Sequence, residues 1–239
     1  MDGPGARLAL VVTAAGRGVR FESRLPKQHV PLLGIPMLQR TLTALSGCDE
    51  VDALVVVVNP EELEYCRAEL VRERIDKVMA VTAGGAERAL SVRNGLQALA
   101  KLGSWDLVGV HDGARPLVTC EEVTRAVQAL VAEPELDGAV LGIPSIDTIK
   151  TVDDQGFITG TPDRRALWRA QTPQIFRWQV LMTAYAQGDD VLLAATDDSS
   201  LVEAHGGKVK VVEGSPENMK ITERSDLRRA ESILAERRQ

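Results

Sequence analysis

The chain has 239 residues, of which 44% are hydrophobic and 26% charged, a balance that indicates one folded domain and excludes a disordered chain. Its net charge of −6 is spread without a basic block, which excludes general binding to nucleic-acid phosphates because that needs clustered Lys and Arg. Aromatic residues make up only 3%, so Val, Leu, Ile and Ala must build the core, as in a buried parallel sheet.

Short runs rich in Val and Leu recur along the chain, and each predicts a buried strand. They span residues 8–13, 53–59, 77–82, 107–111 and 138–143. Between them, apolar residues recur at helical spacing, for example over 38–45 and 123–131. This alternation predicts a Rossmann-like, mostly parallel α/β sheet flanked by helices, with ligands bound at the carboxyl ends of the strands.

The first strand leads into a loop of small residues and cations. Small residues let backbone N–H groups approach a polyphosphate closely, and Arg20 and Lys27 add positive charge nearby. The small residues are Ala14, Ala15, Gly16 and Gly18. Neither a P-loop nor a dinucleotide fingerprint fits, because no Gly-Lys-Ser/Thr follows and Phe21 replaces the third glycine. We therefore expect a nucleoside triphosphate here, although the glycines alone would also suit a structural turn.

The loop after the third strand contains Gly84 and Gly85, and Ser91 follows on the first turn of the next helix. Glycines let the chain pass close to a ligand, and a helix N-terminus favours anionic or polar ligand groups. A base, ribose or phosphate contact would each fit. An ordinary loop before a helix fits almost as well.

The fourth strand ends at Asp112, a typical place for a carboxylate that holds Mg²⁺ on bound phosphates. Arg115 offers a planar fork that suits an acceptor phosphate. His111 precedes Asp112 on the strand, so its side chain points to the opposite face, and we interpret it as structural.

Residues 148–152 and 157–161 flank a four-residue turn and predict a β-hairpin. A hairpin of this size buries little by itself. We therefore expect one domain over 1–239 with a protruding arm over 145–164 that packs on another chain and forms a dimer. An ordinary surface hairpin is the alternative.

The cysteines at 48, 66 and 120 are odd in number, far apart and without metal-ligand spacing. We expect three reduced thiols in a cytoplasmic protein. The apolar run 8–15 is too short to cross a membrane and continues directly into the glycine loop. Secretion and membrane attachment are therefore not expected.

Seven short motifs occur in order along almost the whole chain. They are AAGxGxR, LPKQ, GGxER…S, HDxARP, DTxK, DR…LWxxxTPQ and ENxKIT. Each is weak alone, but together they resemble the 2-C-methyl-D-erythritol 4-phosphate cytidylyltransferase family of the non-mevalonate isoprenoid pathway. The resemblance implies a nucleotidyltransferase fold in which the opening loop wraps the triphosphate of CTP. Gly85 and Ser91 match positions that contact cytosine and ribose, and Asp112 matches one near Mg²⁺ and the nucleotide.

The resemblance also implies an acceptor site for a small phosphorylated polyol. Arg115, Thr172 and Lys220 match its phosphate pocket. Thr148 and Arg164, at the two ends of the arm, match residues supplied by the partner subunit of a homodimer.

The implied reaction is attack by the phosphate of methylerythritol phosphate on the α-phosphorus of CTP, in line with departing pyrophosphate. A phosphate dianion is already nucleophilic, so catalysis reduces to positioning and charge neutralisation. The resemblance gives these catalytic tasks to Lys27 and Lys220, with Arg20 and Mg²⁺, or another divalent metal, restraining the pyrophosphate.

One position departs from the family, because Ala86 stands where an Asp is common. Alanine has no side-chain acceptor, so cytosine selectivity must come from backbone groups or elsewhere. The nearest alternative is a cytidylyltransferase for another polyol phosphate, such as ribitol 5-phosphate. A non-catalytic nucleotide-binding regulator is a second, and Phe21 disfavours a dehydrogenase. No fused downstream synthase is expected, because the chain ends soon after Lys220.

Overall fold

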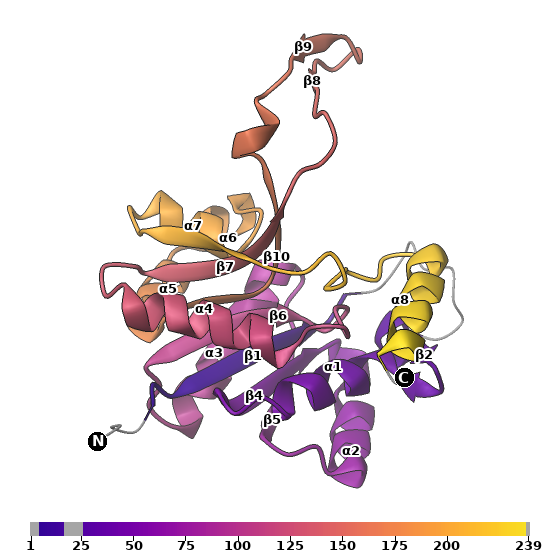
Figure 1. The fold of residues 1–239 in the computed structure, drawn as a ribbon. Helices are drawn as coiled ribbons and strands as arrows, with labels where there is room; N and C mark the ends of the chain where they lie inside the picture. Colours follow the sequence, from indigo (N-terminus) through magenta and orange to yellow (C-terminus); the bar gives the residue numbers. More distant parts are fainter. Residues whose placement is uncertain (1–4, 17–25, 238–239) are drawn as a thin grey trace.

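The computed structural model describes residues 5–16 and 26–237, and a seven-stranded sheet forms its centre (Figure 1). The strands are β1 (Leu8–Ala14), β4 (Val51–Val58), β5 (Val78–Ala83), β6 (Leu107–Asp112), β7 (Gly138–Pro144), β10 (Trp168–Arg177) and β11 (Val209–Glu213). Their order across the sheet is β11-β7-β10-β6-β1-β4-β5. Neighbours pair in parallel, except that β10 runs antiparallel to β6 and β7. The predicted mostly parallel α/β sheet is confirmed, and the five predicted strands end within two residues of their expected bounds.

Helices cover both faces of this sheet, so its central strands are buried on both sides. On one face lie α1 (Met37–Ser46), α2 (Leu63–Glu73) and α4 (Cys120–Ala132). On the other lie α3 (Arg88–Leu102), α5 (Trp178–Tyr185), α6 (Asp189–Ala194) and α7 (Asp198–Ala204). Consecutive strand residues point to opposite faces, so Leu10 packs in the first core and Val11 in the second. Because both faces of these strands are covered, continuous apolar runs form the strands of this sheet.

Smaller elements complete the fold near the strand ends. The C-terminal helix α8 (Arg224–Glu236) packs with Met37 and Leu117 in a third apolar cluster. The short elements are η2 (Lys27–His29), β2 (Pro31–Leu32), β3 (Ile35–Pro36), η3 (Pro60–Glu62) and η4 (Arg164–Ala166). Within the described ranges, none of the helices is long and apolar enough to cross a lipid bilayer.

The strand β10 was not predicted from the sequence. Polar residues and Pro173 interrupt its apolar pattern, and proline is unusual inside a sheet because it donates no ladder hydrogen bond. The pairing of β10 with β7 is indeed interrupted between Ala170 and Gln174. At this interruption, the Thr172 hydroxyl in the middle of β10 contacts the backbone N–H of Asp112 at the end of β6.

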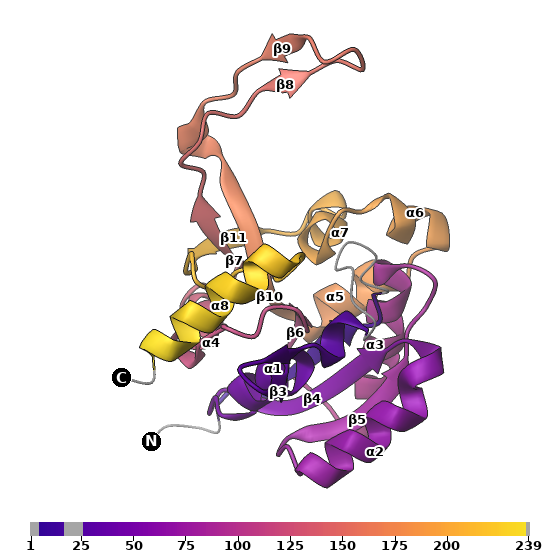
Figure 2. The same cartoon turned by 90° about the vertical axis from the view of Figure 1, so that its right-hand side faces the viewer.

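The predicted hairpin is present and stands away from the sheet (Figures 1 and 2). Its paired segments, β8 (Thr151–Val152) and β9 (Ile158–Gly160), are shorter than the sequence predicted. Asp153 closes the turn, because its carboxylate accepts hydrogen bonds from the backbone N–H groups of Gln155 and Phe157 at 3.0 and 2.9 Å. Phe157 remains 68% exposed at the tip, so a hydrophobic surface is offered to the outside.

The prediction of three reduced thiols is wrong for two of the cysteines. Cys48 and Cys120 form a disulfide with an S–S distance of 2.27 Å and a Cα–Cα distance of 5.0 Å. Cys48 follows α1 and Cys120 begins α4, and these two helices pack on the same face of the sheet. Cys66 is free and 2% exposed, and burial, followed by the charges of Glu62 and Glu69, raises the pKa of its thiol to about 11. It is therefore a neutral thiol of low reactivity.

Thiol counting tests this arrangement. We expect Ellman's reagent to find one thiol in protein unfolded without reductant and three after reduction, because one disulfide and one free cysteine are present. In native protein Cys66 should react only as fast as the chain opens. The variant Cys66→Ser is the control and should show no thiol before reduction. Three thiols in unreduced, unfolded wild-type protein would contradict the disulfide.

Candidate active site

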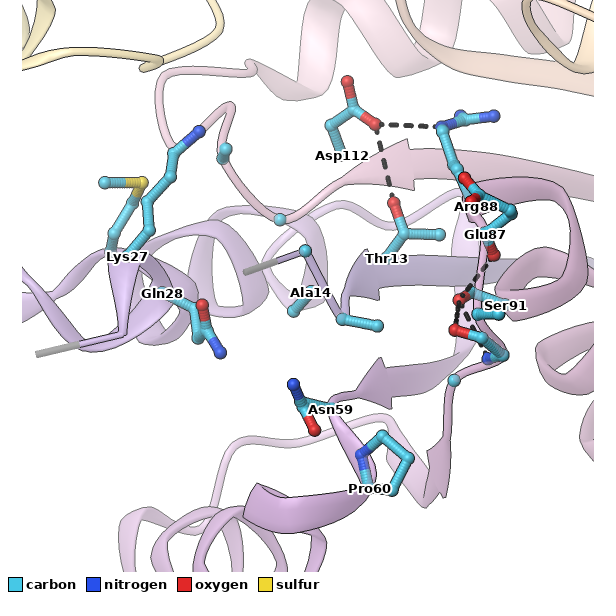
Figure 3. Close-up of a pocket in the computed structure, with 18 of the residues that line it drawn as sticks. Thr13, Ala14, Lys27, Gln28, Asn59, Pro60, Glu87, Arg88, Ser91 and Asp112 are labelled. Carbon is cyan, nitrogen blue, oxygen red and sulfur yellow. Dashed lines mark hydrogen bonds and ion pairs between the residues drawn. The ribbon is translucent and has the colours of Figure 1, made fainter. Parts of the chain in front are cut away.

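A pocket of about 960 Å³ opens at the carboxyl ends of β1, β4, β5 and β6 (Figure 3). It lies where the parallel-sheet rule predicted, and its size is typical of small-molecule sites, which span roughly 300–1,000 Å³. The predicted site residues that line it are Ala14, Ala15, Gly16, Lys27, Gly85, Ser91, Asp112 and Lys220. Figure 3 shows Lys27 on one side of this pocket and Arg88 and Asp112 across it. Gly18 and Arg20 lie outside the described residues.

Gly84 allows two pocket loops to touch. A Cβ atom at this position would lie 2.6 Å from the Cβ of Ala15 and 2.8 Å from the Oγ of Ser91, well inside normal contact distance. The Ser91 hydroxyl accepts a hydrogen bond from the Gly85 N–H at 3.1 Å and donates to the Glu87 carbonyl at 3.0 Å. The loop after β5 thus rests directly on the loop after β1, and Ser91 fixes its backbone.

Asp112, at the end of β6, is the electrostatic centre of the pocket. Its carboxylate lies 2.8 Å from Lys220 Nζ, 3.5 Å from Arg88 Nε and 3.7 Å from Arg115 Nε. Burial alone would raise its pKa, but Lys220, Arg88 and Arg115 together hold the pKa of Asp112 far below its usual range. The carboxylate is therefore ionised, and the cations around it outnumber it, which favours phosphate ligands.

Arg88 is a pocket residue that the sequence analysis did not single out. It is the first residue of α3, and its guanidinium donates two hydrogen bonds to Asp198, at 3.2 and 2.8 Å. Asp198 is fully buried and also accepts a hydrogen bond from the Tyr185 hydroxyl at 2.5 Å. Although burial disfavours its charge, Asp198 and Asp112 raise the pKa of Arg88 above its ordinary value. The GGxER motif contains this arginine, but nothing local indicates a partner 110 residues later.

His111 is fully buried and does not line the pocket. Its Nε2 lies 3.2 Å from the Arg115 carbonyl, and its Nδ1 lies 3.1 Å from the Thr172 hydroxyl. The Nε2–H tautomer satisfies both contacts, since Nε2 then donates to the carbonyl and Nδ1 accepts from Thr172. Burial lowers the pKa of His111 to about 4. The ring is neutral, in keeping with the structural role predicted for it.

Thr172 was predicted to bind the acceptor phosphate, but in this structure it is 5% exposed and does not line the pocket. Besides donating to His111, its hydroxyl accepts a hydrogen bond from the backbone N–H of Asp112 at 3.0 Å. Thr172 thus joins the middle of β10 to the end of β6. Its part in acceptor binding stays a prediction.

Arg115 holds the loop from which Lys220 reaches the pocket. Its Nη1 donates to the Asn218 carbonyl at 2.7 Å, and Gln171 donates to the same carbonyl at 3.1 Å. The Asn218 side chain donates in turn to the Thr172 carbonyl at 2.9 Å. Burial lowers the pKa of Arg115 from its ordinary value. A side chain only 11% exposed therefore positions Lys220, and direct contact with an acceptor phosphate stays a prediction.

Thr148 and Arg164 lie at the base of the arm, and neither lines the pocket of its own chain. Arg164 Nη1 donates to the Ile146 carbonyl at 3.3 Å, which ties the two sides of the arm together. Both residues are exposed. The structure of one chain therefore does not bring them to the other predicted site residues.

Metal binding can be judged from the donor set. Across residues 5–16 and 26–237, no three His, Cys, Asp or Glu side chains cluster as ligands for a metal ion. Asp112 alone faces the pocket as an ionised, largely buried carboxylate. One carboxylate suits Mg²⁺ that is bound mainly by ligand phosphates and water, and not a cage built by the protein.

A Rossmann-like sheet with a small-residue loop, two pocket lysines and the buried carboxylate of Asp112 at the strand ends suits nucleotidyl transfer. The chain matches the family model for 2-C-methyl-D-erythritol 4-phosphate cytidylyltransferase (IspD) over residues 8–236. It belongs to this family.

Individual relatives agree over nearly their whole length. The chain is 41% identical to a 2-C-methyl-D-erythritol 4-phosphate cytidylyltransferase of Geobacter metallireducens, covering 95% of this chain and 97% of the relative. It is 43% identical to one of Pelotomaculum thermopropionicum, covering 97% and 95%. Among solved structures, a 4-diphosphocytidyl-2C-methyl-D-erythritol synthase of Anaerococcus prevotii superposes with a TM-score of 0.80 at 30% identity, covering 97% of this chain and 100% of that one.

His111 should make the fold less stable in mild acid. Its imidazole titrates near 6.5 when unfolded and near 4 when folded, so the unfolded chain binds more protons between these values. The free energy of unfolding should therefore fall as the pH drops through this window, by up to about 3 kcal/mol. Guanidinium unfolding curves from about pH 7 to pH 4, with EDTA present, measure this loss.

The matched control is His111→Gln, whose amide can donate and accept but does not titrate. Its stability should be lower at neutral pH and should depend less on pH over the same window. An identical pH dependence in both proteins would contradict this role of His111.

Proposed function

We infer that the chain is a cytidylyltransferase that converts CTP and 2-C-methyl-D-erythritol 4-phosphate to 4-diphosphocytidyl-2-C-methyl-D-erythritol and pyrophosphate. The observation that supports this most directly is the pairing of Lys220 with Asp112 at 2.8 Å, in a pocket that Lys27 also lines. Two lysines in one pocket suit the attack of one phosphate on another, because both phosphates are negatively charged. Family membership over residues 8–236 names the reaction.

In the proposed reaction, an oxygen of the acceptor phosphate forms a bond to the α-phosphorus of CTP while the bond to pyrophosphate breaks. No protein base is needed, because the acceptor is already an anion. Lys27 and Lys220 neutralise the charge that gathers around the α-phosphate, and Arg20 restrains the pyrophosphate. Lys220 is suited to meet an incoming phosphate, since its side chain is 42% exposed and its ammonium is mobile.

The nucleotide is proposed to lie along the loops after β1 and β5. Ala14, Ala15, Gly16 and Gly18 would supply backbone contacts to the triphosphate, and Gly85 and Ser91 would lie beside the base and ribose. Ala86 lines the pocket without a side-chain acceptor, so base selection would rest on backbone groups. Asp112 would hold Mg²⁺, which when bound supplies charge neutralisation on the phosphates.

The acceptor side is proposed to be completed by a second copy of the chain. Thr148 and Arg164 do not line their own pocket, while Phe157 and Ile158 expose 68% and 64% of their surface on the arm. Burying such side chains on a partner would stabilise a homodimer. The arm over 145–164 would then bring Thr148 and Arg164 to the pocket of the other subunit, beside Arg115 and Thr172. A cytoplasmic location is part of the same proposal.

Pyrophosphate release decides between acceptors. The protein is mixed with CTP, Mg²⁺ and either methylerythritol phosphate or ribitol 5-phosphate. We expect release with the first acceptor. Release with ribitol 5-phosphate alone would favour the alternative transferase, and CTP binding without any release would favour a non-catalytic regulator.

Removal of the Lys27 ammonium should slow the chemical step. We expect Lys27→Ala to reduce turnover at saturating substrates by a factor on the order of 10²–10³, with a far smaller change in CTP affinity. Steady-state pyrophosphate release and calorimetric CTP titration measure the two effects. The control is Lys101→Ala, at the exposed end of α3, which should behave as wild type. Near-full turnover of Lys27→Ala would refute this role.

A shared active site predicts complementation between two inactive variants. Arg164→Ala damages the arm and Lys220→Ala damages the core pocket, so each homodimer should be nearly inactive. In a mixed dimer one pocket has both residues intact. Random exchange of subunits should therefore restore about a quarter of the wild-type activity. The control mixes Lys27→Ala with Lys220→Ala, both in the core, and should restore none. No recovery in the first mixture would contradict sharing.

A further inference from the structure

The three cations around Asp112 are held very differently. Lys220 is the nearest, at 2.8 Å, but its side chain is 42% exposed and ends in a mobile ammonium. Arg88 is more distant, at 3.5 Å, yet two of its guanidinium nitrogens are bound by Asp198. One partner of Asp112 is thus free to move toward a ligand, whereas another is fixed.

The group that fixes Arg88 is itself anchored to the sheet. Asp198 begins α7 and is fully buried, and Tyr185 from α5 donates a hydrogen bond to it. The neighbouring Asp197 accepts from Gln174 of β10 at 2.8 Å, and Gln174 accepts from the Ser199 N–H at 3.0 Å. A buried carboxylate with its hydrogen bonds satisfied is a rigid support.

The proposed reaction would change the contacts of Lys220. A substrate phosphate would compete with Asp112 for Lys220, because the three N–H donors of one ammonium would then be shared between two anions. Asp112 would then keep only part of its nearest counter-charge inside a largely buried site, and Arg88 and Arg115 would remain beside it together with any Mg²⁺ held there. Arg88 cannot follow the phosphate, since Asp198 holds its terminal nitrogens and leaves Nε directed at Asp112.

We propose that Arg88, clamped by Asp198 and Tyr185, is a positioning residue that holds and charge-balances Asp112, and so lets Lys220 turn to the acceptor phosphate. The proposal rests on the transfer reaction inferred above. Under this proposal, α7 affects the pocket through the contact of Asp198 with Arg88, although α7 does not line the pocket.

Kinetics of Arg88→Lys provide the first test, because lysine keeps the charge but loses the planar fork that fits Asp198. We expect kcat/KM for the acceptor to fall by about 10- to 100-fold, while the Kd for CTP changes little. Tyr185→Phe, which deletes one hydroxyl and keeps the ring, should show a smaller loss of the same kind. It keeps the test valid if Arg88→Lys does not fold.

The matched control is Arg93→Lys on the same helix. Arg93 pairs with Asp189 of α6 at 2.6 Å, so it also ties α3 to the helices after β10, but it does not line the pocket. A purely structural role for Arg88 predicts equal kinetics for the two variants. That result would overturn the proposal.

Labelling of Lys220 gives a readout that does not depend on turnover. Without Arg88, Asp112 should hold Lys220 more tightly, so an amine-reactive reagent should label Lys220 more slowly in Arg88→Met than in wild type or Arg93→Met, as measured by mass spectrometry. An unchanged or faster rate would overturn the proposal. Wild-type protein that releases no pyrophosphate would instead contradict the proposed function, and the labelling result would still decide the role of Arg88.

Discussion

The ionised carboxylate of Asp112 is the constraint on which the rest of the site depends. A carboxylate that is 10% exposed at the end of a buried strand would be strongly destabilised without opposite charges, because desolvation costs several kcal/mol per ion. Its three cations come from the start of α3, the turn after β6 and the C-terminal segment. Pairing with one carboxylate therefore joins the turn after β6 to two segments that are distant in the sequence.

Side chains alternate along β6, so the last two residues of this strand face opposite sides of the sheet. Asp112 faces the pocket, while His111 faces the protein and links the Arg115 carbonyl to Thr172 on β10. A neutral imidazole suits this place, because burial disfavours a charged ring more than the nearby Asp112 carboxylate favours it, which lowers the pKa of His111. In this structure the polar groups of Thr172 and Arg115 bind Asp112 and the loop that holds Lys220.

The features that depend on residues close together in the chain could be predicted from the sequence. Strands buried on both faces must be apolar throughout, so the Val-rich run of β4 was readable from the sequence, and the rule for parallel sheets then located the pocket loops. The pairs Arg88–Asp198 and Cys48–Cys120 join residues 110 and 72 positions apart. Neither leaves a periodic or compositional signal, because each depends on how helices pack across a face. The strand β10 was missed for another reason. Its middle residues are polar, so the apolar pattern that predicts a buried strand is interrupted there.

The two halves of the proposed site differ in what sets their geometry. On the proposed nucleotide side, Gly84 lies directly against Ala15 and Ser91, so the described parts of the loops after β1 and β5 are held together at the end of the sheet. The arm has no comparable support, because Phe157 and Ile158 are exposed and a small hairpin buries little by itself. In the proposed homodimer, its geometry would come from the partner surface on which it packs. The interface of this proposed homodimer would order the acceptor side of the pocket, and damage to the arm should weaken acceptor use more than CTP binding.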